Sequence, residues 1–345
     1  MHSILITSVG GPPGRNTLLS LLEAKRYSVV VADADPFAVG IYEEQIPGYV
    51  VPRGDAPAFV AAILKIIEKH SIRVVVPCIE PDVLALAKNQ AAIRAAGAEI
   101  LVPPLTVLQT GLHKGRATTL AVKSGSLAPR TLCLSPGQYS RDEVLDFLKG
   151  LDTGAVVKPS VSYGMKGVLI TSEPNEALYY LDQLEVDAVV QERIPGASGS
   201  MHMVGLIYDG HGRAQRKFVS RSIRTLFENG GPATGGITVH EPDLVERSIA
   251  VLEEIGEWRG PAGVEWIMDP RDGLFKFIEI NPRLWGYSSL TTGSGTNFAE
   301  ALVELALGHE LTPDPGYGIG IAMLRTIQDV IIKTPTFPIP SASGA

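Results

Sequence analysis

The sequence predicts an α/β protein with a parallel sheet in its first part and an α+β arrangement in the remainder. Strand-like apolar runs alternate with amphipathic helical segments over residues 1–103, which is typical of a parallel sheet. Pro103 and Pro104 then interrupt this alternation. The second half instead contains strand pairs joined by Gly-containing turns, which indicates antiparallel hairpins. A chain of 345 residues has room for two or three domains of this kind.

The composition is that of a well-packed globular protein, with 45% hydrophobic and 19% charged residues. The net charge is −7 and no run of Lys and Arg forms a basic patch, which argues against a nucleic-acid partner. No apolar run reaches the roughly 20 residues of a membrane helix, and the N-terminus enters a strand directly, so we expect a cytoplasmic protein without a membrane partner. Cys78 and Cys133 lack metal-ligand spacing and are predicted to be packing residues.

The first part begins with a predicted strand, a glycine-rich turn at residues 10–16 and a helix. Further strands are expected at 28–32, 49–52, 73–77 and 99–102, with helices at 56–70 and 82–96. Ligands of parallel sheets gather at the carboxyl ends of the strands, which places the turn, Asp33 and Glu80 around one crevice. The turn is either a ligand loop or a simple tight turn. Glu80 is the best candidate for a substrate contact, unless it only begins a helix.

A predicted hairpin at residues 262–280 carries a candidate metal site. Glu265 lies on its first strand, and Glu279 and Asn281 share a face of the second because strand side chains alternate. Carboxylate and amide oxygens suit Mg²⁺, and Arg283 follows on the same face, where a guanidinium can grip a phosphate or carboxylate. Solvated hairpin charges are the alternative. However, Glu279 interrupts an apolar run, where an unpaired charge would be costly, so we favour the metal site.

The strand predicted at residues 155–160 ends with Lys158 and leads into a glycine-containing loop. An ammonium ahead of such a loop is a good phosphate clamp, because the loop amides can approach a phosphate closely. Gly164 and Gly167 allow the loop to move. We therefore favour phosphate binding over a surface lysine.

These residues also carry a family resemblance. Glu265 followed by Phe277-Ile-Glu-Ile-Asn-Pro-Arg283 resembles the metal-binding signature of the ATP-grasp superfamily of ligases. Leu284-Trp285-Gly286 resembles the branch related to the carbamoyl phosphate synthetase large subunit. That subunit contains two such units, whereas this chain has no internal repeat and would hold one.

The resemblance spans roughly residues 1–330 and implies a domain organisation. A Rossmann-like domain at 1–103 would help to bind substrate, and a two-lobed ATP-grasp domain at 104–330 would follow. The lid of that domain is expected at about 130–190 and its core at about 191–330. Residues 331–345 are rich in Pro, Ser and Gly and are predicted to form a disordered tail.

The resemblance also implies ATP and Mg²⁺ as cofactors, with Mn²⁺ as a possible substitute, and assigns roles to individual residues. Lys114, with Arg116 as the fallback, and Lys158 would bind the nucleotide phosphates. The family acid that holds the ribose is missing here, so Ser200 or His202 would replace it. The full expected sets are Lys114, Lys158, Ser160, Gly164, Gly167, Glu192, Arg193, Ile194 and Ser200 for the nucleotide, Glu265, Glu279 and Asn281 for the metal, Glu80, Arg221 and Arg283 for the substrate, and Arg283 and Lys158 for catalysis. Lys217 and Arg224 could equally form a solvated strand face.

The implied activity is ATP-dependent ligation of a carboxylate to an amine through an acyl phosphate, on a small molecule derived from an amino acid. One alternative is acyl-phosphate or carbamoyl-phosphate-type chemistry with another acceptor. Another is a degenerate ATP-binding module with a regulatory role. A dehydrogenase is disfavoured because the diphosphate fingerprint is absent. Relatives suggest a homodimer through the first domain.

Overall fold

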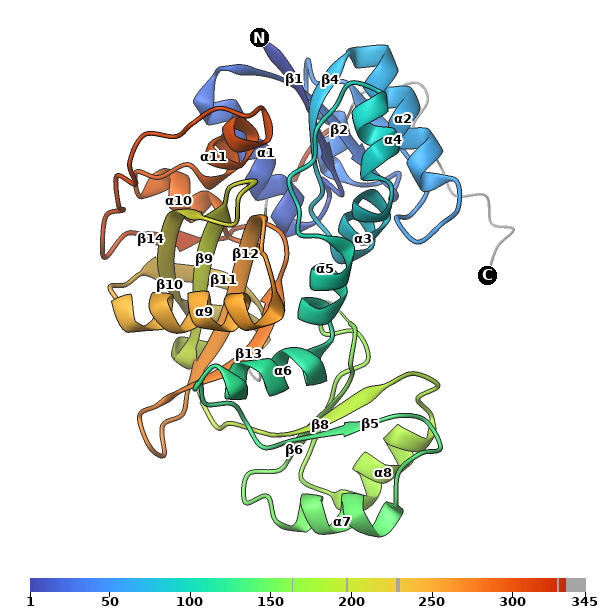
Figure 1. The fold of residues 1–345 in the computed structure, drawn as a ribbon, viewed down its shortest axis with the longest axis vertical. Coiled ribbons are helices and arrows are strands. Elements are labelled where there is room, and N and C mark those ends of the chain that lie inside the picture. Colours follow the sequence, from blue (N-terminus) through green and yellow to red (C-terminus); the bar gives the residue numbers. More distant parts are fainter. Residues whose placement is uncertain (163, 197, 228–229, 328, 333–345) are drawn as a thin grey trace.

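A computed structural model describes residues 1–162, 164–196, 198–227, 230–327 and 329–332 of the chain. The described elements form three sheets, two of four strands and one of six (Figure 1). The predicted α/β fold class, with an α+β second part, is confirmed. The tail predicted to be disordered lies, from residue 333 onwards, outside the described residues.

The first sheet is parallel and has the strand order β3-β2-β1-β4. Its strands are β1 (His2–Thr7), β2 (Tyr27–Asp33), β3 (Gly48–Val50) and β4 (Ile72–Val76). The helices of this region are α1 (Pro12–Ala24), α2 (Phe59–His70), α3 (Glu80–Lys88) and α4 (Gln90–Ala95), with a 3₁₀ turn at Val39–Tyr42. Apolar residues of α2 such as Ile63 and Ile67 are buried against this sheet, as their helical spacing predicted.

Two predicted elements of this region were wrong. The helix expected at 82–96 is interrupted at Asn89, which ends α3 and precedes α4; its side chain donates a hydrogen bond to the carbonyl of Ala85. Asparagine competes for backbone groups in this way and so favours helix ends. The strand expected at 99–102 is only an isolated parallel bridge between Glu99 and Val74. Pro103 and Pro104 follow and have no N–H with which to continue a ladder.

Two helices, α5 (Leu105–Leu112) and α6 (Lys114–Lys123), lead to the second sheet, which is antiparallel. Its order is β5-β8-β6-β7, built from β5 (Thr131–Leu134), β6 (Ala155–Pro159), β7 (Leu169–Thr171) and β8 (Ala188–Glu192). Helices α7 (Arg141–Lys149) and α8 (Pro174–Asp182) pack on one side of it around a separate hydrophobic cluster (Figure 1). This sheet falls in the segment predicted to be the lid.

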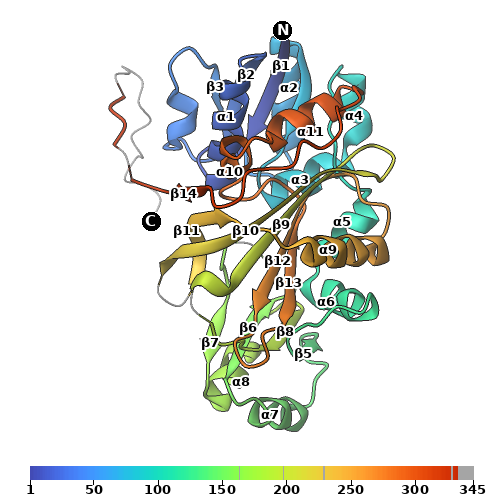
Figure 2. The same ribbon diagram turned by 90° about the vertical axis from the view of Figure 1, so that its left-hand side faces the viewer.

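The third sheet has the order β13-β12-β9-β10-β11-β14. A 3₁₀ turn at Ser198–Ser200 precedes β9 (Met201–Tyr208), and the other strands are β10 (Ala214–Phe227), β11 (Gly230–Thr238), β12 (Gly260–Met268), β13 (Phe275–Asn281) and β14 (Ala322–Leu324). Helix α9 (Pro242–Ile255) covers one face, and α10 (Ser289–Gly293) and α11 (Phe298–Ala306) lie between this sheet and the first one (Figure 2). No strand was predicted at β11, because its glycines and proline conceal the strand pattern.

The first and third sheets share one hydrophobic core. Ile4 and Val76 of the first sheet belong to the same buried cluster as Phe218, Trp285 and Phe298. The Trp285 ring meets the Phe298 ring edge-on, with 5.8 Å between their centroids. The two sheets are therefore packed together through aromatic side chains.

The glycine-rich turn at residues 10–16 contributes to this packing. Asn16 donates to the carbonyl of Gly286 at 2.9 Å and accepts from the backbone N–H of Ser289 at 3.2 Å. The Gly10 N–H donates to Asp33 Oδ2 at 2.7 Å, and a Cβ on Gly14 would lie 2.3 Å from the Ser8 carbonyl oxygen. These internal contacts favour a tight turn over a ligand loop.

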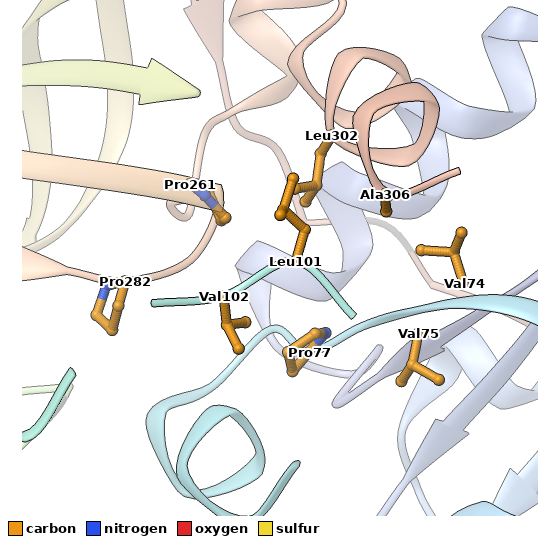
Figure 3. Close-up of a pocket in the computed structure, with 9 residues that line it drawn as sticks. All are labelled: Val74, Val75, Pro77, Leu101, Val102, Pro261, Pro282, Leu302 and Ala306. Atoms are coloured by element: carbon orange, nitrogen blue, oxygen red, sulfur yellow. The ribbon is translucent and has the colours of Figure 1, made fainter. Parts of the chain in front are cut away.

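A small apolar crevice marks the seam between the first and third sheets (Figure 3). Its walls are Val74, Val75, Pro77, Leu101, Val102, Pro261, Pro282, Leu302 and Ala306. All of these side chains are apolar, so the crevice offers no polar recognition. The crevice marks where the chain approaches two predicted site residues. Pro77 lies three residues before Glu80, and Pro282 directly precedes Arg283.

We expect Gly205→Ala to destabilise this core by about 2 kcal/mol, because overpacking a well-packed core has that typical effect. A Cβ at Gly205 would lie 2.2 Å from Cη2 of Trp285. Thermal denaturation of the variant measures the loss. The control is Gly210→Ala in the β9–β10 turn, where an added Cβ meets no atom within 4 Å. Equal melting temperatures for the two variants would contradict the packing described here.

No described helix has the length and apolar character needed to cross a bilayer.

Candidate active site

The hairpin of β12 and β13 brings the predicted metal ligands together. Glu265 lies directly opposite Glu279 in the antiparallel register, and Asn281 lies opposite Gly263. Asn281 Nδ2 donates to Glu265 Oε1 at 2.9 Å. The pairing follows from the turn that connects the strands, in which the Gly273 N–H bonds to the carbonyl of Asp269 at 2.8 Å.

Lys114, the first residue of α6, contacts one of these carboxylates, Glu279. Its side chain is buried, its Nζ lies 3.4 Å from Glu279 Oε2, and it donates to the carbonyl of Ser162 at 2.8 Å. The Lys114 N–H also donates to the carbonyl of Ser160 at 2.8 Å. Helix α6 and the loop after β6 are therefore joined beside Glu279.

Lys158 ends the buried part of β6 and is 7% exposed. The pKa of Lys158 is lowered to about 8, chiefly by burial and also by the Lys114 charge, although the Glu279 charge opposes both effects. Burial alone would raise the pKa of Glu279, but Lys114 and Lys158 outweigh burial and hold that pKa below its ordinary value. Two buried ammonium groups thus act on one partly exposed carboxylate.

Glu265 has the opposite electrostatic environment. The pKa of Glu265 is raised to about 7, chiefly by burial and also by the neighbouring Glu279 charge. Two carboxylates that repel each other on adjacent strands suit a divalent cation. The amide nitrogen of Asn281 faces Glu265, and its oxygen accepts from Arg283. No group of three or more His, Cys, Asp or Glu is placed to hold a metal among the described residues. A metal here would be held by the carboxylates of Glu265 and Glu279, with the amide oxygen of Asn281, which accepts from Arg283, as the third predicted ligand.

Arg283 connects this hairpin to the first sheet. Its Nε donates to Glu80 Oε1 at 3.0 Å, and its Nη2 lies 2.8 Å from the same oxygen. Nη2 also donates to Asn281 Oδ1 at 3.0 Å. Both side chains of the Glu80–Arg283 pair are largely buried, and the pair joins α3 to the end of β13. The sequence indicated both residues but not this contact.

Three residues predicted to bind the nucleotide, Glu192, Arg193 and Ile194, lie at the end of β8. The Glu192 carboxylate forms an ion pair with Arg271 at 2.6 Å, and Arg271 also pairs with Asp269 at 2.6 Å. The Arg193 N–H donates to the carbonyl of Gly154 at 3.0 Å, and Ile194 is buried. Arg271 was not identified from the sequence, because its partner Glu192 is far away in the chain.

The loop after β6 contains the remaining predicted phosphate contacts. Gly164 and Gly167 have φ angles of 61° and 67°, which glycine adopts without strain. A Cβ on Gly167 would also lie 3.1 Å from Pro159. Ser160 is buried, and its hydroxyl has no hydrogen-bond partner. Residue 163 of this loop lies outside the described residues.

The predicted ribose and substrate residues on β9 and β10 have separate environments. The carbonyl of Ser200 interacts with His202 Nδ1 at 3.0 Å, and burial lowers the pKa of His202. Arg221 is exposed and aligns with His202 across the strands. Lys217 lies 3.4 Å from Glu246, and Arg224 donates to Thr234 Oγ1 at 2.9 Å. Among the described residues, no hydrogen bond or ion pair joins Ser200 or Arg221 to Glu279.

The geometry therefore divides the predicted residues into groups. A central cluster contains Lys114, Lys158, Glu265, Glu279, Asn281, Arg283 and Glu80. A second group, Glu192 to Ile194, lies at the end of β8. The central cluster combines buried cations that can bind phosphate with carboxylates that can bind a metal, which is the arrangement that phosphoryl transfer needs.

Comparisons with known proteins bear on this arrangement. Residues 4–101 match the family described as "PylC-like, N-terminal domain", and residues 132–287 match the family described as "ATP-grasp domain". The carbamoyl phosphate synthase large chain of Mycobacterium tuberculosis is 25% identical over 272 residues, which are 72% of this chain and 23% of the relative. The chain spans about a quarter of the length of the first curated relatives that it matches.

Solved structures share the fold at low identity. The N5-carboxyaminoimidazole synthetase of Staphylococcus aureus, crystallised with ADP, superposes with a TM-score of 0.69 at 13% identity and covers 94% of this chain and 80% of its own. The L-amino acid ligase of Bacillus licheniformis superposes with a TM-score of 0.64 at 17% identity and covers 89% of this chain and 74% of its own. The family match shows that residues 132–287 form an ATP-grasp domain, as the resemblance of residues 265–286 predicted, and the solved structures show the same fold.

Proposed function

We propose that the chain is an ATP-dependent ligase that joins a small carboxylate to an amine through an acyl phosphate. The observation that supports this most strongly is the ion pair of the buried Lys114 with Glu279, which lies opposite Glu265. The buried Lys158 also acts electrostatically on Glu279. Lys114 and Lys158 carry two positive charges, and among the described residues Glu279 is the one carboxylate that faces them directly. Such an excess of positive charge suits a polyphosphate ligand. The family match and the ADP-bound relative of similar fold are consistent with this proposal.

In this proposal, Lys114 and Lys158 bind the nucleotide phosphates from two sides. Lys158 lies on β6 of the second sheet and Lys114 on α6. Ser160, Gly164 and Gly167 line the loop over the phosphates, and Glu192, Arg193, Ile194 and Ser200 complete the nucleotide site. Residues of both the second sheet and α6 thus contact the same triphosphate, which excludes water from it.

Glu265, Glu279 and Asn281 would hold Mg²⁺, with Mn²⁺ as a substitute. When bound, the metal neutralises charge on the phosphate oxygens. The chain orients this site through its own contacts, since Asn281 is held by both Glu265 and Arg283. An ion there would also relieve the repulsion between the two carboxylates.

The proposed reaction has two steps. A carboxylate oxygen of the first substrate attacks the γ-phosphorus of ATP and ADP leaves, which forms the acyl phosphate. The amine then attacks the acyl carbon, phosphate leaves, and the nitrogen loses a proton to give the amide. Arg283, aided by Lys158, would stabilise the negative charge of both steps, and Glu80 and Arg221 would contact the substrates.

ADP and phosphate release from MgATP tests this function. We expect release only when one carboxylate and one amine are both present, in a panel of amino acids supplied singly and in pairs. Hydroxylamine should replace the amine and yield a hydroxamate, because it traps acyl phosphates. If the protein binds ATP but nothing in the panel stimulates release, the ligase proposal is wrong for amino acids and a regulatory ATP-binding module is favoured.

A second candidate is carbamoyl-phosphate-type chemistry, which the name of the curated relatives favours. Bicarbonate would then replace the carboxylate as the phosphoryl acceptor. ADP release stimulated by bicarbonate without any amino acid would support this candidate over the ligase. Bicarbonate belongs in the same assay as a separate arm.

We expect ATP affinity to fall as the pH rises through about 8, the pKa to which burial lowers Lys158. The ammonium form binds the phosphates, and it is lost above this pKa. Isothermal titration in buffers of different ionisation enthalpy should therefore detect more proton uptake on ATP binding at pH 8.5 than at pH 7. In Lys158→Arg, which stays charged, this difference should disappear. An unchanged pH dependence in that variant would exclude Lys158 as its source.

We further propose the domain division 1–103 and 104–330, and a homodimer formed through the first domain. Light scattering after size-exclusion chromatography measures the assembly state directly. A monomer at micromolar concentration would contradict the dimer without affecting the proposed activity.

A further inference from the structure

One oxygen of the Glu80 carboxylate has no partner. Oε1 receives Nε of Arg283 at 3.0 Å and lies 2.8 Å from Nη2, whereas Oε2 is buried without a hydrogen bond. The Glu80 side chain is 7% exposed. A buried carboxylate oxygen is strongly disfavoured without a donor, so a donor is expected at Oε2.

Arg283 is the positive charge that pairs with Glu80, and carboxylates outnumber it in this region. Asp82 is buried and accepts hydrogen bonds from the neutral hydroxyls of Thr7 at 2.6 Å and Ser8 at 2.7 Å. Asp33 lies in the same region, since Asp33, Asp82 and Arg283 all act electrostatically on the thiol of Cys78. With Glu80, these groups comprise three carboxylates and one guanidinium. The donor that best complements this edge of the first sheet is therefore a cation.

Arg283 complements Glu80 as a binding group. Its Nε, Nη1 and Nη2 already bond to Glu80, to the carbonyl of Leu284 at 3.2 Å and to Asn281. A guanidinium carries five N–H groups, so one N–H on Nη1 stays available. The pair thus offers a carboxylate oxygen that accepts and an N–H that donates, next to each other.

We propose that Glu80 Oε2 binds the amino nitrogen of an amino-acid substrate, while the free N–H of Arg283 binds an oxygen of its carboxyl group. Glu80 then determines specificity for a primary amine at the carboxyl edge of the first sheet. The inference rests on the proposed ligase function, because that function places Arg283 at the reacting carboxyl group. A water molecule at Oε2 is the competing explanation.

Direct binding separates these explanations. The probes are the standard L-amino acids and methylammonium, titrated calorimetrically into the protein in the presence of MgADP. Each amino acid that binds is compared with the deaminated carboxylic acid of the same carbon skeleton. We expect the wild type to bind the deaminated acid roughly 20-fold more weakly, the effect of losing one charge-assisted hydrogen bond.

The Glu80→Gln variant should bind the amino acid roughly 20-fold more weakly than the wild type, and the deaminated acid with unchanged affinity. Glu99→Gln is the matched control, because it removes the same charge from an exposed pair with Arg94 in the same region. If Glu80→Gln does not fold, Glu80→Asp is the second variant. It keeps the charge and should reduce the affinity for the amino acid by a smaller factor. Folding is checked by ADP binding.

Three results would overturn the assignment. They are equal binding of an amino acid and its deaminated analogue by the wild type, unchanged amino-acid affinity in Glu80→Gln, and no binding of any amine in the panel. The assay requires no turnover, so the proposed ligase function can fail separately. Selective amine binding without ADP release would retain the Glu80 assignment and reject the ligase.

Discussion

Glu279→Gln is expected to reduce ATP-dependent turnover by roughly 10³-fold, the scale seen when charge stabilisation is removed from an active site. The variant removes the carboxylate that faces Lys114 at 3.4 Å and that lies opposite Glu265. The metal site then loses a charged ligand, and Lys114 and Lys158 lose the carboxylate that compensates their charge. Steady-state ADP release measures the effect.

The control for this variant is Glu246→Gln, which neutralises an exposed carboxylate on α9 paired with Lys217. Its turnover should equal that of the wild type. Glu279→Gln also separates two buried lysines from their counter-charge, which typically destabilises by about 3 kcal/mol, so its melting temperature must be measured in parallel. A folded Glu279→Gln variant with wild-type turnover would remove Glu279 from the catalytic site.

Lys158→Met should reduce turnover by roughly 10²-fold or more through the loss of a phosphate-binding charge. The same variant should be at least as stable as the wild type without ATP. Burial lowers the Lys158 pKa from 10.5 to about 8, which disfavours the folded protein by about 3 kcal/mol at neutral pH. Turnover and melting temperature are therefore expected to change in opposite directions.

The pH dependence of stability tests whether the buried charge of Lys158 causes this difference in stability. Because the folded pKa of Lys158 lies below its unfolded value, the unfolded chain binds more protons between about pH 8 and 10.5. The wild type should gain stability over that range relative to Lys158→Met. Lys123→Met, at an exposed lysine, provides the control. A Lys158→Met variant that is less stable than the wild type at every pH would show that the lysine stabilises the fold.

The parts of the fold that could be predicted depend on local signals. The hairpin of β12 and β13 was predicted almost to the residue, because its turn contains Pro270 and Gly273 and its strands alternate in polarity. Strand β11 was missed because glycines contribute no side-chain pattern, although backbone pairing with β10 defines it. The break at Asn89 was missed because the apolar spacing continues across it.

In the candidate site, too, only features with a local sequence signal could be predicted. Residue types and family resemblance indicated Lys114, Lys158 and Glu279 individually, and the structure places them together. The pairing of Glu80 with Arg283 joins residues far apart in the chain, and it arises from packing of the first sheet against the third. No local pattern carries that information. The ion pair of Arg271 with Glu192 likewise depends on how the second sheet meets the hairpin turn.

The most direct test of the proposed acyl phosphate is transfer of isotope from the carboxylate substrate. The first step makes a bond between a carboxylate oxygen and the γ-phosphorus, and the second step leaves that oxygen on phosphate. With a substrate pair that supports ADP release and a carboxylate labelled with ¹⁸O, we predict one labelled oxygen in each phosphate released. Phosphate without label, or labelled only from ¹⁸O-water, would contradict the acyl phosphate and show that ATP is hydrolysed directly.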